Sequence, residues 1–299
     1  MKVQAFGSVV VDDGTRRLGA RDFGGVKPKQ LFELLVLHRG RPVSKDELTE
    51  ALWGEKAPRD RIATLEAYMS VLRNRLQPGA GRNGSLIVTE YGAYRLDTDR
   101  AKVDLDRFDT LVRQAKTAPA SQARGLLLEA SRVAAGQLFE DEPYADWVLD
   151  ARDRYARQRV EVLVDAATLH LESDAAAALR LAEDAIALDQ TCERAYMEAM
   201  RAANELGRRD LVLRTFERCA KVLETELGVR PLAETVQLRD RLSAVSAVIA
   251  ERADTARPST VISTELGATA SRIGQGQSRH RRSHASPARY ATSGCRRTR

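Results

Sequence analysis

The most regular apolar pattern in the chain lies between Arg61 and Leu76. Apolar side chains recur there at steps of three and four residues, which places them on one side of a helix. They are Ile62, Leu65, Met69, Leu72 and Leu76. The opposite side carries short polar groups, small residues and an arginine in place of the usual glutamates and lysines. Its members are Ala63, Thr64, Ala67, Ser70, Val71, Asn74 and Arg75.

Two shorter helical patterns precede this stretch. The first runs from Lys27 to about His38, and Gly40 predicts its end because glycine accepts the left-handed conformation that follows many helices. The second begins with a capping box, in which Ser44 and Glu47 each satisfy a backbone N–H of the first turn. The sequence therefore predicts two helices ahead of the one at 61–76.

Short β-like segments flank the three helices. Residues 1–24 contain the β-branched or apolar pieces VQAFG, SVVVDD and TRRLG, separated by glycine and Asp-Asp-Gly turns. Residues 85–97, SLIVTEYGAYRLD, predict two strands joined around Tyr91 and Gly92. The order of strands, three helices and a hairpin is that of a winged helix-turn-helix, whose third helix can enter a DNA major groove.

The chain from about Val103 to Ala250 has helical periodicity throughout. ALRLAEDAIAL at 178–188 recurs loosely as VLRTFERCAKV at 212–222, an offset of 34 residues. This is the period of the tetratricopeptide repeat, a helix hairpin that buries its apolar face by stacking on its neighbours. We therefore predict a mainly α protein: a winged helix at 1–100, an all-α tetratricopeptide-like domain at 101–253 and a disordered tail at 254–299.

The charge distribution qualifies the formal net charge of +6. Residues 272–299 contain eight arginines and no acidic residue, whereas residues 1–100 hold 17 Lys and Arg against 13 Asp and Glu. Residues 101–271 carry an acidic excess. The basic tail can be an inert extension, a source of non-specific nucleic-acid affinity or the product of an altered gene end. The sequence leaves these alternatives open.

Several classes of protein are excluded or disfavoured by missing signals. No apolar run is long enough to span a membrane, and the N-terminus lacks a signal-peptide core, so we expect a cytoplasmic protein without membrane contact. The three cysteines lack metal-site spacing, and His280 and His284 stand in a stretch without carboxylates, so we expect no metal and no cofactor. There is no GxSxG or HExxH motif, which disfavours an enzyme.

Several motifs, in one order along the chain, resemble the SARP family (Streptomyces antibiotic regulatory proteins). The winged helix part carries KPKQLFELLVLHRGRPVSKDELTEALWG, ATLEAYMSVLRNRL and GAYRLD. The helical part carries VDLDRFDTLV, LFEDEPYADWV and ELGVRPLAET, which resemble the bacterial transcriptional activator domain of that family. The resemblance covers roughly residues 2–245 and implies an OmpR-type winged helix followed by this activator domain.

The resemblance implies a transcriptional activator that binds direct repeats upstream of promoters. Its partners would be double-stranded DNA and the RNA polymerase holoenzyme, and it would form a homodimer on DNA. Carried over by position, the residues on the major-groove face are Arg61, Thr64, Ala67, Ser70, Val71, Asn74 and Arg75. Those expected near phosphates or in the wing are Ser44, Lys45, Tyr94 and Arg95.

This chain departs from the family pattern in two places. OmpR-type wings commonly carry Arg-Gly-x-Gly-Tyr, but here Glu90 takes the arginine's place and would repel a phosphate. Tyr94 has two open roles, packing beneath the hairpin or touching a phosphate. The sequence has no GxxxxGK[ST] loop and no receiver domain before the winged helix, so neither ATP-driven nor kinase-driven control is implied. The alternative function is a helical-repeat adaptor whose winged helix binds protein.

Overall fold

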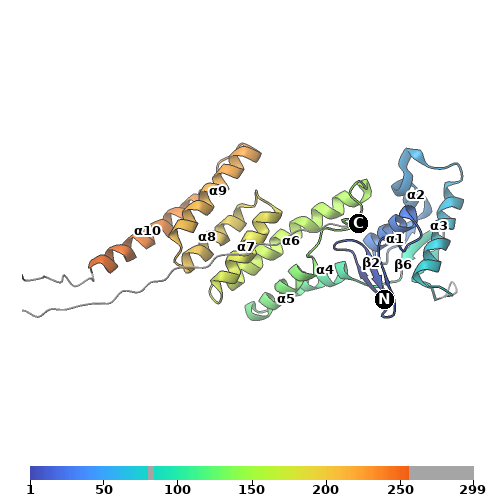
Figure 1. Cartoon of the computed structure of the whole chain (residues 1–299), viewed down its shortest axis with the longest axis horizontal. Coiled ribbons are helices and arrows are strands. Elements are labelled where there is room, and N and C mark those ends of the chain that lie inside the picture. The colour runs from blue at the N-terminus through green and yellow to red at the C-terminus, as the bar shows by residue number, and fades with distance from the viewer. Residues whose placement is uncertain (80–83, 256–299) are drawn as a thin grey trace, which may run out of the picture. The chain divides into compact units, whose positions relative to one another are not determined.

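The computed structural model describes residues 1–79 and 84–255, of which Met1–Thr255 form one compact unit (Figure 1). The prediction of a disordered tail falls almost entirely outside the described residues. Its expected start at residue 254 lies in the last turn of α10 (Ala233–Thr255). The mainly α class with small sheets near the N-terminus is confirmed.

A four-stranded sheet opens the chain. The apolar pieces of residues 1–24 predicted strands, and they form β1 (Lys2–Gln4), β2 (Val10–Asp12) and β3 (Arg17–Leu18). These three strands pair antiparallel. The sequence did not reveal β7 (Lys102–Val103), which adds to β1 in parallel and completes the order β3-β2-β1-β7. The sheet therefore joins the start of the chain to the segment that follows the winged helix.

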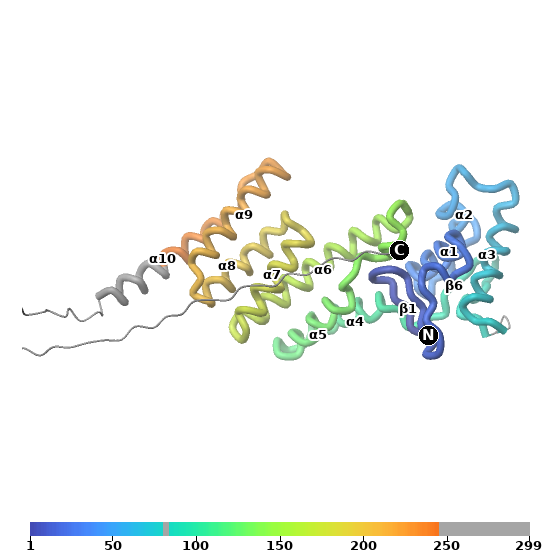
Figure 2. Tube along the Cα trace, viewed as in Figure 1, coloured from blue at the N-terminus to red at the C-terminus, as the bar shows by residue number. Residues whose placement is uncertain are grey.

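The winged helix contains the three predicted helices. They are α1 (Val26–His38), α2 (Lys45–Trp53) and α3 (Arg61–Leu76). A 3-10 turn, η1 (Gly54–Lys56), follows α2. The predicted hairpin consists of β5 (Ile87–Glu90) and β6 (Ala93–Leu96), and a short strand β4 (Val43–Ser44) adds to β6. In Figure 2 the third helix lies at one side of this unit, with β6 beside it.

After β7, residues 104–255 are mostly helical, and the longest non-helical segment lies between α5 and α6. Consecutive helices pack against each other from α4 (Asp104–Ala115) and α5 (Ala120–Val133) to α10. Those between are α6 (Leu149–His170), α7 (Ala175–Leu188), α8 (Glu193–Glu205) and α9 (Arg209–Leu227). The 34-residue offset found in the sequence relates α7 to α9, and each of these helices packs on α8.

The expectation of helix throughout this region is wrong for residues 134–148. They form an irregular segment with one 3-10 turn, η3 (Asp146–Val148). Leu138 forms isolated bridges with Phe6 and Gly7, and the Phe139 N–H donates to the Ala5 carbonyl. Gly136 permits this approach, because a Cβ atom there would lie 2.6 Å from the Gly7 nitrogen. Long-range backbone pairing thus replaces helix in this segment.

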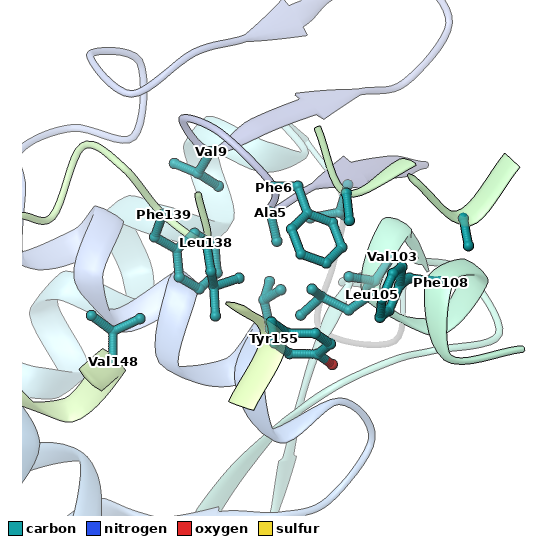
Figure 3. Close-up of a cluster of buried hydrophobic side chains, with 14 of the residues drawn as sticks. Ala5, Phe6, Val9, Val103, Leu105, Phe108, Leu138, Phe139, Val148 and Tyr155 are labelled. Carbon is teal, nitrogen blue, oxygen red and sulfur yellow. The ribbon is translucent and has the colours of Figure 1, made fainter. Parts of the chain in front are cut away.

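One hydrophobic core runs through both parts of the chain. The rings of Phe6, Phe108 and Tyr155 meet edge-on at centroid distances of 5.4–5.9 Å (Figure 3). These three residues come from the N-terminal segment, α4 and α6, and all are buried. Edge-to-face packing of aromatic rings is favourable beyond the area it buries. The winged helix and the helical domain are therefore joined by a shared core.

Arg39 makes a second connection between the two parts. It follows α1, and its guanidinium lies 2.9 Å from the Asp106 carboxylate and 2.8 Å from that of Asp109, both on α4. It also donates a 2.7 Å hydrogen bond to the Tyr155 hydroxyl on α6. An arginine can serve several acceptors at once because its planar group holds five N–H donors. Arg39 therefore fixes the end of α1 against two helices of the other part.

A buried charge cluster makes the third connection. Lys29 on α1 pairs with Asp141 and Glu142 of the irregular segment, and its ammonium lies 3.4 Å from a carboxylate oxygen of Glu33. Both Glu33 oxygens are buried without a hydrogen-bond partner. Burial raises the pKa of Glu33 to about 8, although Lys29 opposes the shift. Burial therefore favours the protonated form of Glu33, which leaves Asp141 and Glu142 as the main partners of the lysine charge.

Candidate nucleic-acid interface

The apolar stripe of α3 packs inward as predicted. Leu65, Met69, Leu72 and Leu76 are buried, and Ile62 is half-buried. This leaves the other side of the helix to solvent. The exposed residues there include Ala63, Ala67, Ser70, Val71, Asn74 and Arg75, while Thr64 is half-buried. Arg61 is also exposed, but it lies beside α2 next to Asp46. The structure thus brings together most of the residues expected on the major-groove face.

The exposed surface of α3 is not uniform. Ala63, Ala67, Ser70 and Asn74 lie opposite the buried stripe, since helical residues advance by about 100° each. Val71 lies toward the loop before α1, where a Cβ atom on Gly24 would come within 2.5 Å of its side chain. Gly24 has a φ of +88° and so lets the backbone pass close to α3. Val71 and Arg75 therefore form one edge of the exposed surface.

Ion pairs engage two of the cations expected to contact DNA. Lys45 at the start of α2 pairs with Glu66 on α3, and Arg61 lies 3.2 Å from the Asp46 carboxylate. Glu66 is exposed, so the outer side of α3 does carry a carboxylate, contrary to the description of this face from the sequence. Lys45 is consequently not a free cation. A phosphate contact from it would first have to displace Glu66.

Ser44 has a structural task at the start of α2. Its hydroxyl oxygen accepts a 3.1 Å hydrogen bond from the Glu47 N–H, and its own N–H donates to the Glu47 carboxylate at 2.9 Å. The capping box predicted from the sequence is therefore confirmed. The carboxylate also accepts a 2.8 Å hydrogen bond from the Ser44 hydroxyl. Ser44 thus uses its polar groups within the cap.

The wing requires a correction for Tyr94. Its side chain is only 4% exposed, so packing beneath the hairpin replaces the expected phosphate contact. Arg95 lies on the same strand and donates to the Glu90 carboxylate at 2.8 and 3.0 Å. The acid in the family's arginine position is thus neutralised within the wing. Neither of the two expected wing residues presents a free polar group to a ligand.

Arg73 is the residue that sequence reasoning missed. Its guanidinium donates to the Ile87 carbonyl at 2.9 Å and to the Thr89 hydroxyl at 2.7 Å. It also lies over the Tyr94 ring, 5.6 Å from the centroid. The side chain therefore ties α3 to both strands of the wing. Its position on α3 between the buried stripe and the exposed surface was visible in the periodicity, but its partners lie 14 and more residues away.

The far side of α2 is acidic. A cleft of about 970 Å³ lies between α2 and the irregular segment. The carboxylates of Asp46, Glu47, Glu50 and Asp146 line it and outnumber its two cations, Lys27 and Arg61. Trp53 and Trp147 are half-buried in its walls, where Trp53 stacks on Tyr68 with a centroid distance of 6.1 Å. Carboxylates repel phosphates. This cleft therefore limits a nucleic-acid surface to the side formed by α3 and the wing.

Two family profiles match the chain in the order of its structural parts. The profile described as "Transcriptional regulatory protein, C terminal" matches residues 25–96, and that described as "Bacterial transcriptional activator domain" matches residues 103–243. A winged helix-turn-helix followed by this helical domain defines a class of bacterial transcriptional regulators. Within that class the chain belongs to the SARP family. The family consists of transcriptional regulators, in agreement with the prediction that the chain is not an enzyme.

Relatives differ greatly in length. The regulatory protein DnrI of Streptomyces peucetius is 29% identical over 232 residues, which cover 71% of this chain and 82% of DnrI. The regulatory protein AfsR of Streptomyces griseus is 28% identical over 245 residues, covering 79% of this chain but 24% of AfsR. The chain therefore spans about a quarter of the length of AfsR.

A solved structure has the same fold. Mycobacterium tuberculosis EmbR, in complex with a low-affinity phosphopeptide, superposes with a TM-score of 0.70 at 22% identity. The match covers 85% of this chain and 70% of that one. In the part of the chain that the structure describes, every helix is too short or too polar to cross a membrane.

Proposed function

We propose that the chain is a sequence-specific DNA-binding activator that inserts α3 into the major groove of direct repeats upstream of promoters. The observation that supports this most is the exposed surface of Ala63, Ala67, Ser70 and Asn74 on a helix fixed by its buried stripe. Small residues allow the backbone to approach the groove floor, and an asparagine can bond the edge of an adenine at two points.

In this proposal the residues of α3 and α2 contact different parts of the DNA. Asn74 and Ser70 read base edges, and Arg75 at the edge of the surface contacts a base or a phosphate. Arg61 and Lys45 contact phosphates after exchanging their carboxylate partners for the DNA backbone. Thr64, Ala67 and Val71 supply close apolar contacts, for example with thymine methyl groups.

The helical domain supports the second part of the proposal. Two protomers lie head-to-tail on the repeat, and the stacked helices of residues 104–255 contact RNA polymerase. Stacked helix hairpins present extended surfaces for partners. The shared core and Arg39 hold this domain against the winged helix, so that DNA binding also positions the partner surface.

The experiment is selection of sheared genomic DNA by the purified full chain at near-physiological salt, followed by sequencing. Recovery of a few promoter fragments that share a direct repeat supports the proposal. Uniform recovery by a folded protein contradicts it and favours the alternative, an adaptor whose winged helix binds protein. Titration with salt separates the two further, since the logarithm of the binding constant falls by about 0.9 per phosphate contact for each unit of log salt concentration.

A further inference from the structure

The tip of the wing has an unusual residue at a strained position. Strands β5 and β6 are joined by two residues, Tyr91 and Gly92, with φ angles of 39° and 83°. Positive φ at both residues is typical of the tight turns that suit the twist of a hairpin, and asparagine, aspartate or glycine normally occupies the first position. A tyrosine there costs free energy because its Cβ crowds the backbone. Local folding does not explain this choice.

Packing does not explain it either. The Tyr91 side chain is fully exposed, the largest exposure among the hydrophobic residues in the part of the chain described. Within that part it forms no hydrogen bond and no ring contact, in contrast to Tyr94 three residues later. Strained residues persist where they have a function, so the outlier points to a contact outside this chain.

The charged residues of the wing strands are engaged with each other. The charged side chains of β5 and β6 are Glu90 and Arg95, and they pair with each other at 2.8 Å. Tyr94 is buried beneath them. A wing with these partners has no free cation on its strands with which to hold a phosphate. The tyrosine at the tip is the polar group that remains available.

The wing is held in place relative to the base-reading helix. Arg73 on α3 donates to the Ile87 carbonyl and to the Thr89 hydroxyl, so β5 follows α3 as one body. The turn begins two residues after Thr89. When α3 occupies a major groove, the wing therefore approaches the DNA together with it, as the N-terminal arm of a homeodomain reaches the minor groove beside its recognition helix.

We propose that Tyr91 makes the wing's contact with DNA, with its ring against a sugar and its hydroxyl donating to a phosphate oxygen. This inference rests on the proposed function. It assigns the role expected of Arg95 and Tyr94 to a neutral residue at the turn. The wing then adds affinity with little dependence on salt, because no counterion is released by an uncharged side chain.

The test compares three variants of the full chain on a selected promoter fragment by fluorescence anisotropy. We expect Tyr91→Gly to weaken binding about tenfold, a size typical of a hydrogen bond to a charged group. Its unfolding temperature should stay equal or rise, because glycine accepts a positive φ. Tyr91→Phe should lie between wild type and Tyr91→Gly. Tyr144→Gly, which removes a tyrosine 95% exposed outside the wing, is the matched control and should bind like wild type.

Four results would overturn the inference. If the wild type recognises its site and Tyr91→Gly binds equally well, the wing contact is wrong and the proposed function stands. If Tyr91→Gly unfolds at a lower temperature and loses affinity in proportion, Tyr91 serves the fold. If the wild type shows no preference for any fragment, both the proposed function and the inference fail. A slope of affinity against salt that changes in Tyr91→Gly would contradict the neutral contact.

Discussion

At the scale of single residues, the exposed surface of α3 differs from an ordinary solvent-exposed helix face because its side chains are mostly short and one of them is an asparagine. Asn74 has a donor and an acceptor at a position opposite the buried stripe, where no other part of the described chain covers it. Ala63 and Ala67 on the same surface keep the approach open. The proposed reading of bases therefore depends on a few short side chains.

Asn74→Ala should relax discrimination between the selected site and a scrambled one by on the order of 1–3 kcal/mol, because one bidentate base contact is lost. Competition binding with the two fragments measures this. Asn204→Ala, at the end of α8, serves as the matched control and should leave discrimination unchanged. Equal discrimination in Asn74→Ala and wild type would remove Asn74 from the base-reading residues.

Removing the charge of Glu66 should strengthen DNA binding, whereas Asn74→Ala should weaken discrimination. Glu66→Gln frees the Lys45 ammonium from its ion pair and removes a negative charge beside the DNA. Affinity for non-specific DNA should rise, and the salt slope should steepen by about 0.9, the value for one further phosphate contact. Binding at several salt concentrations measures both. An unchanged slope would show that Lys45 does not reach a phosphate even when it is free.

At the scale of elements, one side chain connects α3 to the wing. Arg73 makes this connection through two hydrogen bonds and a contact with the Tyr94 ring. The hairpin itself is short, and a two-stranded ribbon is only marginally stable alone. The wing therefore depends on α3 for its position as well as on its own strand pairing.

Arg73→Met keeps much of the side-chain volume and removes the donors. We expect it to destabilise the fold by about 1–3 kcal/mol, because the carbonyl of the buried residue Ile87 loses a charged partner. Amide exchange in β5 and β6 should rise more than in α7 or α8. Arg180→Met, on α7 and without an ion pair in the described structure, is the control and should change neither. Uniform loss of protection across the chain would argue against a local connection.

The sequence predicted those elements that are specified by neighbours along the chain. The helix at 61–76 follows from its periodicity, and the start of α2 follows from Ser44 and Glu47. Strands β4 and β7 have two residues each, and their existence depends on partners far away in the sequence. The irregular segment at 134–148 was missed for the same reason.

The candidate site was also only partly predictable from the sequence. Which α3 residues face outward was predictable, since burial follows from the apolar stripe. The engagement of Lys45 by Glu66 and of Arg95 by Glu90 was not, because ion pairs between elements depend on the tertiary structure. Glu66 was the available signal, because its place four residues after Ile62 puts a carboxylate at the edge of the apolar stripe of the same helix.

At the scale of the whole molecule, the two parts are held together by contacts of different kinds. The shared core is apolar, whereas Arg39 and Lys29 form charged connections between α1 and the helices and irregular segment that follow. Breaking one partner of a buried ion pair is costly because an uncompensated charge remains. The arrangement favours one orientation of the winged helix.

The charged connection makes stability depend on pH. The pKa of Glu33 is raised from 4.5 to about 8 in the folded state, so the folded state binds the proton more tightly than the unfolded chain. Stability from this group is therefore complete below the unfolded pKa and is lost as pH rises toward and through 8. Glu33→Gln has no carboxyl group to ionise at this position. Between pH 7 and pH 9 its free energy of unfolding should therefore fall by about 1 kcal/mol less than that of the wild type.

Chemical denaturation at the two pH values measures this difference. Glu161→Gln, at an exposed position on α6, is the matched control and should follow wild type. Parallel curves for wild type and Glu33→Gln would show that Glu33 is ionised throughout this range. Such a result would place three carboxylates, all charged, around Lys29.

The core shared by Phe6, Phe108 and Tyr155 limits how far the chain can be treated as modular. A chimera that exchanges only residues 25–96 with a relative would keep the sheet and the helical domain but replace Lys29 and Arg39. The carboxylates of Asp141 and Glu142 would then lose Lys29, and those of Asp106 and Asp109 would lose Arg39, unless the relative has the same cations. Functional exchange of target preference thus requires transplanting the outward side chains of α3 alone, or moving these contacts together with the winged helix.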